Sequence, residues 1–338
     1  MRHAHKALRK RGILRSYSSL VIGFLSIFIA AGLSSAGHNP KHNPKHFPKK
    51  VTCGAMITTD TKLTSDLNCD TYADGPALTV DGGTLDLNGH RVIGNPDINC
   101  IEVTGGATLR NGTVMNCKEG ILVEGDRNKI IGLKSLNNER RGFRITDGDE
   151  NLLYKCLAKG NGRKGFSIEE GDDNVVEKCS AMDNGQQGFS LEKGDSNKIY
   201  YSKANANCRD GIEIDEGSDN RVVNNFVEDN GKKEVCDKFA KDPTNPDDDY
   251  YYKPWYYAGI DVTNNSNNNE IKYNSACGNL GCIPCYDEVE GPTCKARERN
   301  FWDENVDDFG DSVSTNVWEN NRVVCKDVMP EFSPEPED

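Results

Sequence analysis

The chain has 338 residues, a formal net charge of −12 and 28% charged residues. This acidic balance argues against nucleic acid and anionic membrane surfaces as partners, because an acidic exterior repels their phosphates. The 13 cysteines are typical of an oxidising compartment in which most of them pair, and the odd number leaves at least one outside any intramolecular pair.

Residues 1–36 are predicted to be a signal peptide. A basic start leads into the apolar run from Leu20 to Leu33, and small residues follow up to Ala36. The alternative is an uncleaved membrane anchor, but these 14 residues would span only about 21 Å of a hydrocarbon core of about 30 Å. Cleavage removes six positive charges and no negative ones, so the net charge moves from −12 to −18. We therefore expect a secreted, extracellular or cell-wall protein without stable membrane insertion.

Residues 37–50 form a lead rich in His, Pro and Lys. His38, His42 and His46 recur every four residues and could bind copper or zinc, whereas a plain linker is the simpler interpretation. Beyond these, the repeat body holds His90 alone, so a Ser-His-Asp or Cys-His centre is not expected. Two sequons, at Asn111 and Asn264, are compatible with a secreted glycoprotein.

The middle of the chain repeats itself every 22 or 23 residues. The repeats begin at Gly120, Gly142, Gly165, Gly188 and Gly211, and a sixth begins at Gly259 after an insertion. Alternating apolar positions such as Phe166 and Ile168 indicate short strands, and the GD-N and NG turn signals exclude long helices. Two asparagine series recur at the same period: Asn128, Asn151, Asn174, Asn197 and Asn220, and Asn138, Asn161, Asn184, Asn207 and Asn230. Asparagine tolerates the left-handed conformation of tight turns, and stacked amides can form a ladder.

These features predict an all-β chain: a right-handed parallel β-helix solenoid with 22–23 residues per turn over residues 51–325. Cys53 to Cys69 form an expected first turn that their own disulfide could close. The coil is expected to contain an insertion at 231–258 and a cysteine-rich cap at about 277–325, followed by a disordered acidic tail at 326–338.

The chain resembles the secreted right-handed parallel β-helix repeat proteins, a superfamily described as pectate-lyase-like or as carbohydrate-binding and sugar-hydrolase. The similar stretches are CGAMITTDTKLTSDLNC, GGTLDLNGHRV and the repeated GF-I--GD-N, which together cover roughly 200 of the 338 residues. The resemblance implies long, usually acidic polysaccharides as ligands. It implies no particular activity, since such relatives include lyases, hydrolases, epimerases, metal-delivery proteins and adhesins. No DPH triplet of the kind associated with mannuronan epimerases is present.

A repeated outward residue becomes a column with one side chain about every 4.8 Å. One such column is acidic: Thr146, Glu169, Glu192 and Asp215, with Glu213 in the row beside it. Carboxylates at this spacing suit a glycosidase acid and base, and they could instead recruit calcium. The alternative is that they only keep the surface soluble. The candidate catalytic residues are Glu169, Glu192, Glu213 and Asp215.

A second column is basic and precedes the glycines: Arg140, Arg163, Gln186 and Arg209. These guanidinium groups could bind successive carboxylates or sulfates of a glycan, or they could pair with the acidic column. The insertion offers further candidates for sugar binding in Tyr252, Trp255 and Tyr256, whose rings could equally cover the side of the coil. Asp247, Asp248 and Asp249 beside them are a candidate calcium site.

Cys156 and Cys179 occupy one repeat position, so they either form a disulfide or stack as core thiols. Cys277, Cys282, Cys285, Cys294 and Cys325 have irregular spacing, which favours disulfides over zinc.

The sequence therefore predicts a secreted β-helix that binds cell-wall or extracellular polysaccharide and leaves turnover open. An enzyme of this kind would be a lyase, a hydrolase or a uronan epimerase. The rivals are a non-catalytic structural or adhesive protein and a metal-handling protein.

Overall fold

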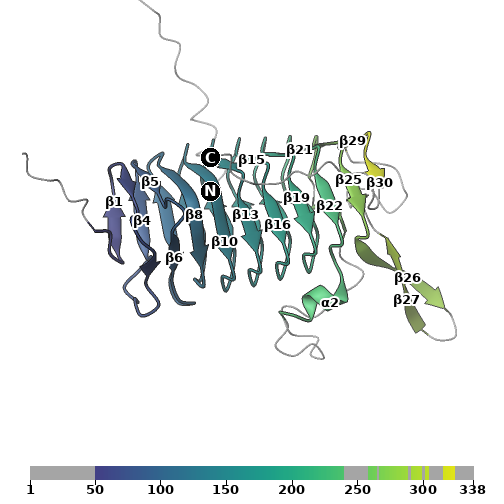
Figure 1. Cartoon of the computed structure of the whole chain (residues 1–338). Coiled ribbons are helices and arrows are strands. Elements are labelled where there is room, and N and C mark those ends of the chain that lie inside the picture. The colour runs from purple at the N-terminus through teal and green to yellow at the C-terminus, as the bar shows by residue number, and fades with distance from the viewer. Residues whose placement is uncertain are drawn as a thin grey trace, which may run out of the picture. The chain divides into compact units, whose positions relative to one another are not determined.

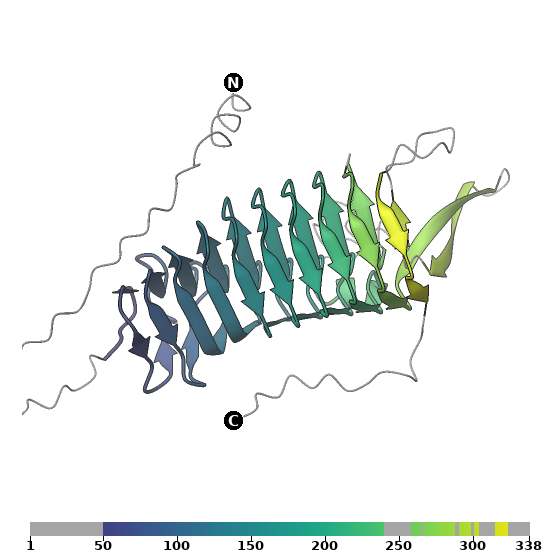
Figure 2. The same ribbon diagram turned by 90° about the horizontal axis from the view of Figure 1, so that it is seen from above.

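A computed structural model describes residues 50–239, 258–264, 266–287, 291–298, 301–303 and 315–323. Short parallel strands stack along one axis (Figures 1 and 2). One side of the coil is a 10-stranded parallel sheet, called here the first sheet. Its strands are β1 (Ala55–Ile57), β4 (Leu78–Asp81), β7 (Ile101–Thr104), β9 (Ile121–Glu124), β11 (Phe143–Thr146), β14 (Phe166–Glu169), β17 (Phe189–Glu192), β20 (Ile212–Asp215), β23 (Ile260–Thr263) and β28 (Phe301–Asp303).

The other strands form two further sides, in which each strand pairs in parallel with the equivalent strand of the next turn. One side holds β2 (Thr61–Lys62), β5 (Thr84–Asp86), β12 (Leu152–Tyr154), β15 (Val175–Glu177), β18 (Lys198–Tyr200), β21 (Arg221–Val223), β24 (Glu270–Lys272) and β29 (Val317–Glu319). The next holds β3 (Leu67–Asn68), β6 (Arg91–Ile93), β13 (Leu157–Lys159), β16 (Ser180–Met182), β19 (Lys203–Asn205), β22 (Phe226–Glu228), β25 (Ser275–Cys277) and β30 (Arg322–Val323). Two longer strands, β8 (Thr108–Met115) and β10 (Lys129–Leu136), run through both sides.

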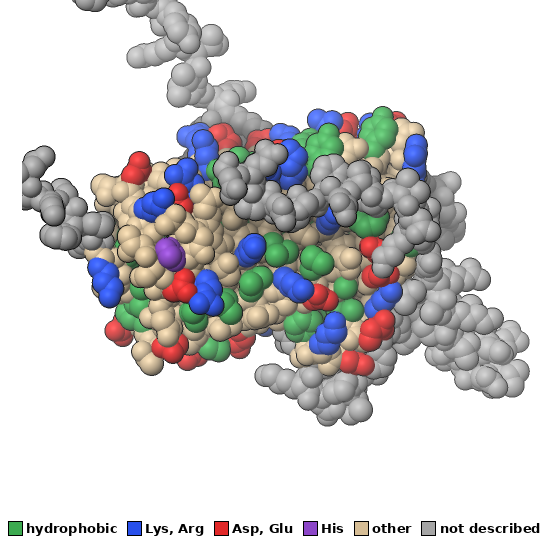
Figure 3. Space-filling view, viewed as in Figure 1, with side chains coloured by type: hydrophobic (Ala, Val, Ile, Leu, Met, Phe, Trp, Pro, Cys, Tyr) green, Lys and Arg blue, Asp and Glu red, His purple; other side chains and the backbone are tan. Residues whose placement is uncertain are grey.

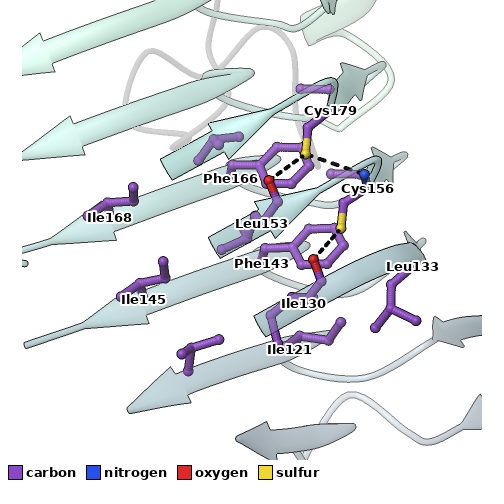
Figure 4. Packing of buried hydrophobic residues seen from close by; sticks show 14 of the residues in the cluster. Ile121, Ile130, Leu133, Phe143, Ile145, Leu153, Cys156, Phe166, Ile168 and Cys179 are labelled. Carbon is purple, nitrogen blue, oxygen red and sulfur yellow. Dashed lines mark hydrogen bonds between the residues drawn. The ribbon is translucent and has the colours of Figure 1, made fainter. Parts of the chain in front are cut away.

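The predicted register is confirmed by the pairing of equivalent residues. Phe166 lies beside Phe143 and Phe189, and their rings stack with centroids 4.6 and 4.8 Å apart. Figure 4 shows the rings of Phe143 and Phe166 with the buried aliphatic side chains of the same turns. Alternation along each strand places one side chain in this core and the next outside, because successive side chains of a strand point to opposite faces.

Both asparagine series form buried ladders, as predicted. In one of them, Asn161 donates from its backbone N and from Nδ2 to Asn184 Oδ1, at 3.1 and 2.9 Å, and Asn184 repeats the pattern on Asn207. The expected left-handed conformation falls elsewhere. It belongs to the residue before each asparagine in both series, such as Asp183 before Asn184 and Asp173 before Asn174, with φ of 51° and 56°. The asparagines are therefore required for their amides, and the tight turn lies one position earlier.

A third ladder was not recognised in the sequence because its residue type changes along the coil. The backbone N of Cys156 donates to Cys179 Sγ, and the backbone N of Cys179 donates to Ser202 Oγ. Asn225 and Asn274 continue the series. Cys156 and Cys179 are free, buried thiols, and their sulfurs also contact the carbonyls of Ile130 and Leu153 (Figure 4). Of the two alternatives for this pair, stacked thiols are therefore correct.

The repeated glycine that opens each strand of the first sheet is required by close approach. A Cβ on Gly165 would lie 2.7 Å from the carbonyl oxygen of Gly188 and 2.8 Å from Asn184 Nδ2. Any larger residue would therefore push the ladder and the next turn apart.

Disulfides join neighbouring parts of the coil. Cys53–Cys69 closes the first turn as expected, and Cys100–Cys117 lies two turns later. Cys208–Cys236 ties the short helix α2 (Lys233–Cys236), at the start of the insertion, to the coil.

The coil departs from the regular repeat at two places. The pairing offset rises from 23 residues to 49 where β21 meets β24, because the insertion lies between them. Within the region expected to be a cap, β26 (Leu280–Asp287) and β27 (Gly291–Glu298) form an antiparallel hairpin, and β28, β29 and β30 then add strands to the coil. The region is therefore more than a terminal cap. In the part of the chain described here, no helix is long and apolar enough to cross a membrane.

Candidate functional site

The acidic column lies on the outer face of the first sheet. Glu169 pairs in register with Thr146 and Glu192, and Glu192 pairs with Asp215. A second row runs beside this column, two residues earlier in each strand, and consists of Arg144, Ser167, Ser190 and Glu213. The strand alternation predicted from sequence therefore brings all four candidate catalytic residues to one face.

Glu169 lies between two guanidinium groups. Arg144 donates from Nε and Nη2 to Glu169 Oε2 at 3.0 and 2.6 Å, and Arg141 Nη2 lies 2.9 Å from Oε1. Burial by itself would raise the pKa of Glu169, but the hydrogen bond from Arg144 and the charges of Arg141 and Arg144 hold this pKa below its usual value. Glu169 is therefore an ionised and paired carboxylate at neutral pH, which is unsuited to donating a proton.

Glu192 is paired in a similar way. The ammonium group of Lys164 contacts Glu192 Oε1 and lies 3.3 Å from Ser190 Oγ. The Ser190 hydroxyl lies 3.0 Å from Glu192 Oε1 and 2.9 Å from Glu213 Oε2, and can donate to one of them at a time. Ser190 thus links two carboxylates of neighbouring turns.

Glu213 forms a second cluster with Asp210, a residue that was not singled out from the sequence. Gln187 Nε2 donates to Glu213 Oε1 at 2.9 Å, and the backbone N of Ala258 donates to Asp210 Oδ1. Burial, and secondarily the charge of Glu213, raises the pKa of Asp210 to about 8. Burial also raises the pKa of Glu213. Asp210 therefore carries a proton at neutral pH, but with 3% exposure its carboxyl group does not face solvent.

Asp215 occupies the end of the acidic column. Its Oδ1 accepts hydrogen bonds from Thr263 Oγ1 at 3.3 Å and from Asn264 Nδ2 at 2.6 Å. The four candidate catalytic carboxylates are thus all bound by neighbouring donors. The nearby Glu119 is bound by Arg141 as well, at 3.1 Å. This arrangement stabilises the face and leaves few carboxylate oxygens free for proton transfer.

The basic column lies in the turn that leads into the first sheet. Backbone hydrogen bonds stack its members, from Arg140 on Lys118 to Arg209 on Gln186. The column is called here the basic stripe: Lys118, Arg140, Arg163, Gln186 and Arg209. Lys118 was missed in the sequence although it stands 22 residues before Arg140. All five side chains are half-buried.

The cations divide between two roles. Arg141, Arg144 and Lys164 neutralise the acidic column. Arg140 and Arg163 form no ion pair and no side-chain hydrogen bond with any described residue, so they do not pair with the acidic column. In the two turns that hold Arg140 and Arg163, the residue directly before the glycine, Arg141 or Lys164, reaches the carboxylates.

Several sequence candidates lie outside the described residues: Tyr252, Trp255, Tyr256, Asp247, Asp248, Asp249, His38, His42, His46 and Cys325. Among the residues that the structure does describe, no group of three or more His, Cys, Asp or Glu side chains could hold a metal ion.

Comparison with known proteins identifies the coil. A family model described as "right handed beta helix region" matches residues 77–293. No curated protein sequence matches the chain. Among solved structures, tailspike protein 2 from Escherichia coli O157:H7 bacteriophage CAB120 is 13% identical with a TM-score of 0.51, over 75% of this chain and 38% of the tailspike. This chain therefore spans well under half of that protein's length.

Two other solved structures are similar in fold. A mutant of the periplasmic alginate epimerase AlgG is 13% identical, with a TM-score of 0.48, over 84% of this chain and 82% of the epimerase. The pectate lyase Pel9A is 14% identical, with a TM-score of 0.42, over 83% of this chain and 80% of the lyase. These likenesses concern the fold alone.

Proposed function

The chain belongs to the right-handed β-helix family, and from this premise we propose that it is a secreted protein that binds an acidic polysaccharide along the basic stripe. The observation that carries the proposal is the division of the cations. Arg140 and Arg163 lie one turn apart, are half-buried and form no ion pair with any described residue. Arg141 and Lys164 beside them are ion-paired with carboxylates.

A repetitive coil suits a repetitive ligand. Parallel turns place equivalent side chains about 4.8 Å apart. A chain that runs along the axis would therefore meet Lys118, Arg140 and Arg163 in succession. Guanidinium groups bind carboxylate and sulfate through paired hydrogen bonds, so acidic sugars fit them better than neutral ones. Because the whole chain has a net charge of −12, the free cationic groups of Arg140 and Arg163 are a local exception.

Binding without turnover is supported better than catalysis. Glu169 and Glu192 pair with cations, and Asp215 accepts hydrogen bonds from Thr263 and Asn264. An enzyme, either a lyase, a hydrolase or an epimerase, is the second candidate. It is favoured by one observation: the raised pKa values of Asp210 and Glu213, on the same face as an ionised Glu169 two turns away, because carboxyls with separated pKa values can serve as acid and base.

The decisive experiment measures binding of oligogalacturonate, a heparin-derived oligosaccharide and a neutral cello-oligosaccharide by calorimetry. We expect the wild type to bind at least one acidic probe, and the Arg140→Gln/Arg163→Gln variant to bind it about 2- to 30-fold more weakly. The matched control is Arg91→Gln/Arg127→Gln, which removes the same charge from arginines that are already ion-paired at the surface.

Equal weakening in the control would mean that only net charge matters, and absence of binding to both acidic probes would refute the proposal. Turnover is tested on the same probes by reducing-sugar release and by the absorbance of unsaturated uronates. Product formation that Glu192→Gln or Glu213→Gln abolishes would establish the enzyme instead.

A further inference from the structure

A groove of about 260 Å³ lies at another corner of the coil, between the β18, β21 and β24 side and the β19, β22 and β25 side. Its lining contains two tyrosines, Tyr201 and Tyr273, one phenylalanine, Phe226, and five polar residues, among them Lys203, Asn224 and Ser275. Figure 3 presents the face that carries β19 and β22, where hydrophobic and cationic side chains are interspersed.

The two tyrosines are exposed at a cost in backbone energy. Tyr201 and Tyr273 have φ of 50° and 57°, in the left-handed region that disfavours bulky residues. The equivalent positions of other turns hold Lys155, Lys178, Asn224 and Asn320 in the same conformation, which asparagine adopts more readily than the larger residues. The tyrosine side chains are 52% and 54% exposed, so burial does not offset the cost. Folding therefore does not explain why tyrosine occupies these two positions.

The polar groups around the rings are unused. The side chains of Lys203, Asn224 and Ser275, and the hydroxyls of Tyr201 and Tyr273, form no hydrogen bond with any described residue. Directly beneath them, the ladder residues are saturated: Asn225 Nδ2, for example, donates to Ile199 O at 2.8 Å and to Asn274 Oδ1 at 3.1 Å. The groove thus has a rigid floor and free donors and acceptors at its rim.

We propose that this groove binds one sugar unit that carries a carboxylate or a sulfate. The apolar face of a pyranose would pack on Phe226 and between the two tyrosine rings, which lie two turns apart on either side of Asn224. The sugar hydroxyls would bond to Asn224 and Ser275. Lys203 is the only charged side chain in the described lining, so it selects an anionic substituent.

The size of the groove limits the ligand. Its volume of about 260 Å³ is smaller than the roughly 300–1,000 Å³ of sites for drug-sized molecules, so one ring is seated and the rest of a chain stays in solvent. This inference depends on the groove alone, and it holds whether or not the basic stripe binds polysaccharide, because the two occupy different corners of the coil.

The test uses Tyr201→Asn and Tyr273→Asn, since asparagine occupies the same turn position elsewhere in the coil and should preserve the fold. Calorimetric titration with trigalacturonate, a sulfated heparin-derived disaccharide and cellotriose would distinguish carboxylate, sulfate and neutral ligands. We expect each tyrosine variant to weaken the best acidic probe by about 2- to 10-fold. Lys203→Gln is expected to weaken the acidic probes and to leave any binding of cellotriose unchanged.

The matched control is Lys178→Asn, which changes the same turn position one turn before Tyr201, outside the groove. The Arg140→Gln/Arg163→Gln variant is titrated in parallel and should keep the tyrosine-dependent binding. Undiminished affinity in all three groove variants would overturn the proposal. So would a wild type that dimerises in sedimentation while the tyrosine variants are monomeric, because the groove would then be a contact between copies of the chain.

Discussion

Arg144 binds the carboxylate of Glu169 in the adjacent turn of the coil, with Nη2 2.6 Å from Oε2 although the two residues are 25 positions apart in the sequence. The pair is diagonal, since the residue directly beside Glu169 in the preceding strand is Thr146. Diagonal pairs of this kind, together with Arg141 and Lys164, connect successive turns on the outside of the first sheet as the asparagine ladders do on the inside.

Replacing Arg144 by Gln should make the coil less stable and change its response to acid. Because the pKa of Glu169 in the folded state is below its unfolded value, its contribution is complete above about pH 4.3 and is lost as the pH falls through the folded-state pKa. We expect the free energy of unfolding at pH 7 to fall by about 1 kcal/mol, with a shallower decline below pH 5. Urea denaturation at several pH values measures both. Arg127→Gln also frees a carboxylate whose pKa its guanidinium lowers, that of Glu150, but it should change the acid profile less than Arg144→Gln does, because solvent screens this exposed pair.

Asp210 should make the protein less stable in alkali. Its pKa is raised to about 8 by burial and by Glu213, so the folded state keeps a proton that the unfolded state has lost above about pH 4. This contribution is largest at low pH and disappears as the pH rises through 8. Asp210→Asn should therefore flatten the decline between pH 5 and 9, while the exposed Glu216→Gln should not. A wild-type unfolding free energy that is constant from pH 5 to 9 would contradict the assignment.

Asn184→Ala should be among the most destabilising single changes. It removes the acceptor of the backbone N and Nδ2 of Asn161, and it removes the Nδ2 that donates to Ala158 O and to Asn207 Oδ1, all in a buried ladder. We expect a loss of about 3–5 kcal/mol in the free energy of unfolding. Asn205→Ala, at a half-buried position outside the ladder, should cost far less. Similar losses in both variants would mean that the ladder does not hold the turns together.

Cys156 and Cys179 should resist alkylation in the native protein. Both thiols are buried, and burial raises the pKa of Cys179 well above its usual value, so little thiolate is available. Mass spectrometry of peptides after iodoacetamide treatment should find both residues unmodified before denaturation and modified after it. Cys179→Ser should retain the native fold, because Ser202 already fills the equivalent ladder position in the next turn. A disulfide-linked peptide containing both residues would refute the thiol assignment.

The fold was predictable because the same residue type recurs at equivalent positions of the repeat, and each of these types has a well-defined structural role. Glycines 22 or 23 residues apart mark where turns touch, and Phe143, Phe166 and Phe189 mark a core position. The third ladder escaped because Cys179, Ser202 and Asn225 perform the same task with different chemistry. A repeated hydrogen bond cannot be recognised in a sequence when the residue type that forms it changes from turn to turn.

The candidate site was predictable only in outline. Spacing placed Glu169, Glu192 and Asp215 in one column, and the structure confirms their register. Spacing did not indicate that Arg141 and Lys164, rather than Arg140 and Arg163, would pair with the acids. Neither Asp210 nor the pair Tyr201 and Tyr273 belongs to a repeated pattern, so no sequence signal distinguished them.

The sequence by itself determined which residues stand above one another, because a period of 22 or 23 residues wraps into a parallel coil in a single register. The tertiary structure alone decided which charges neutralise each other and which remain free. A long side chain at one corner can reach carboxylates of the preceding turn and of the following one, as Arg141 does with Glu119 and Glu169, and local packing decides which it binds. The same packing decides that Asp210 is buried and that Tyr201 stays in solvent.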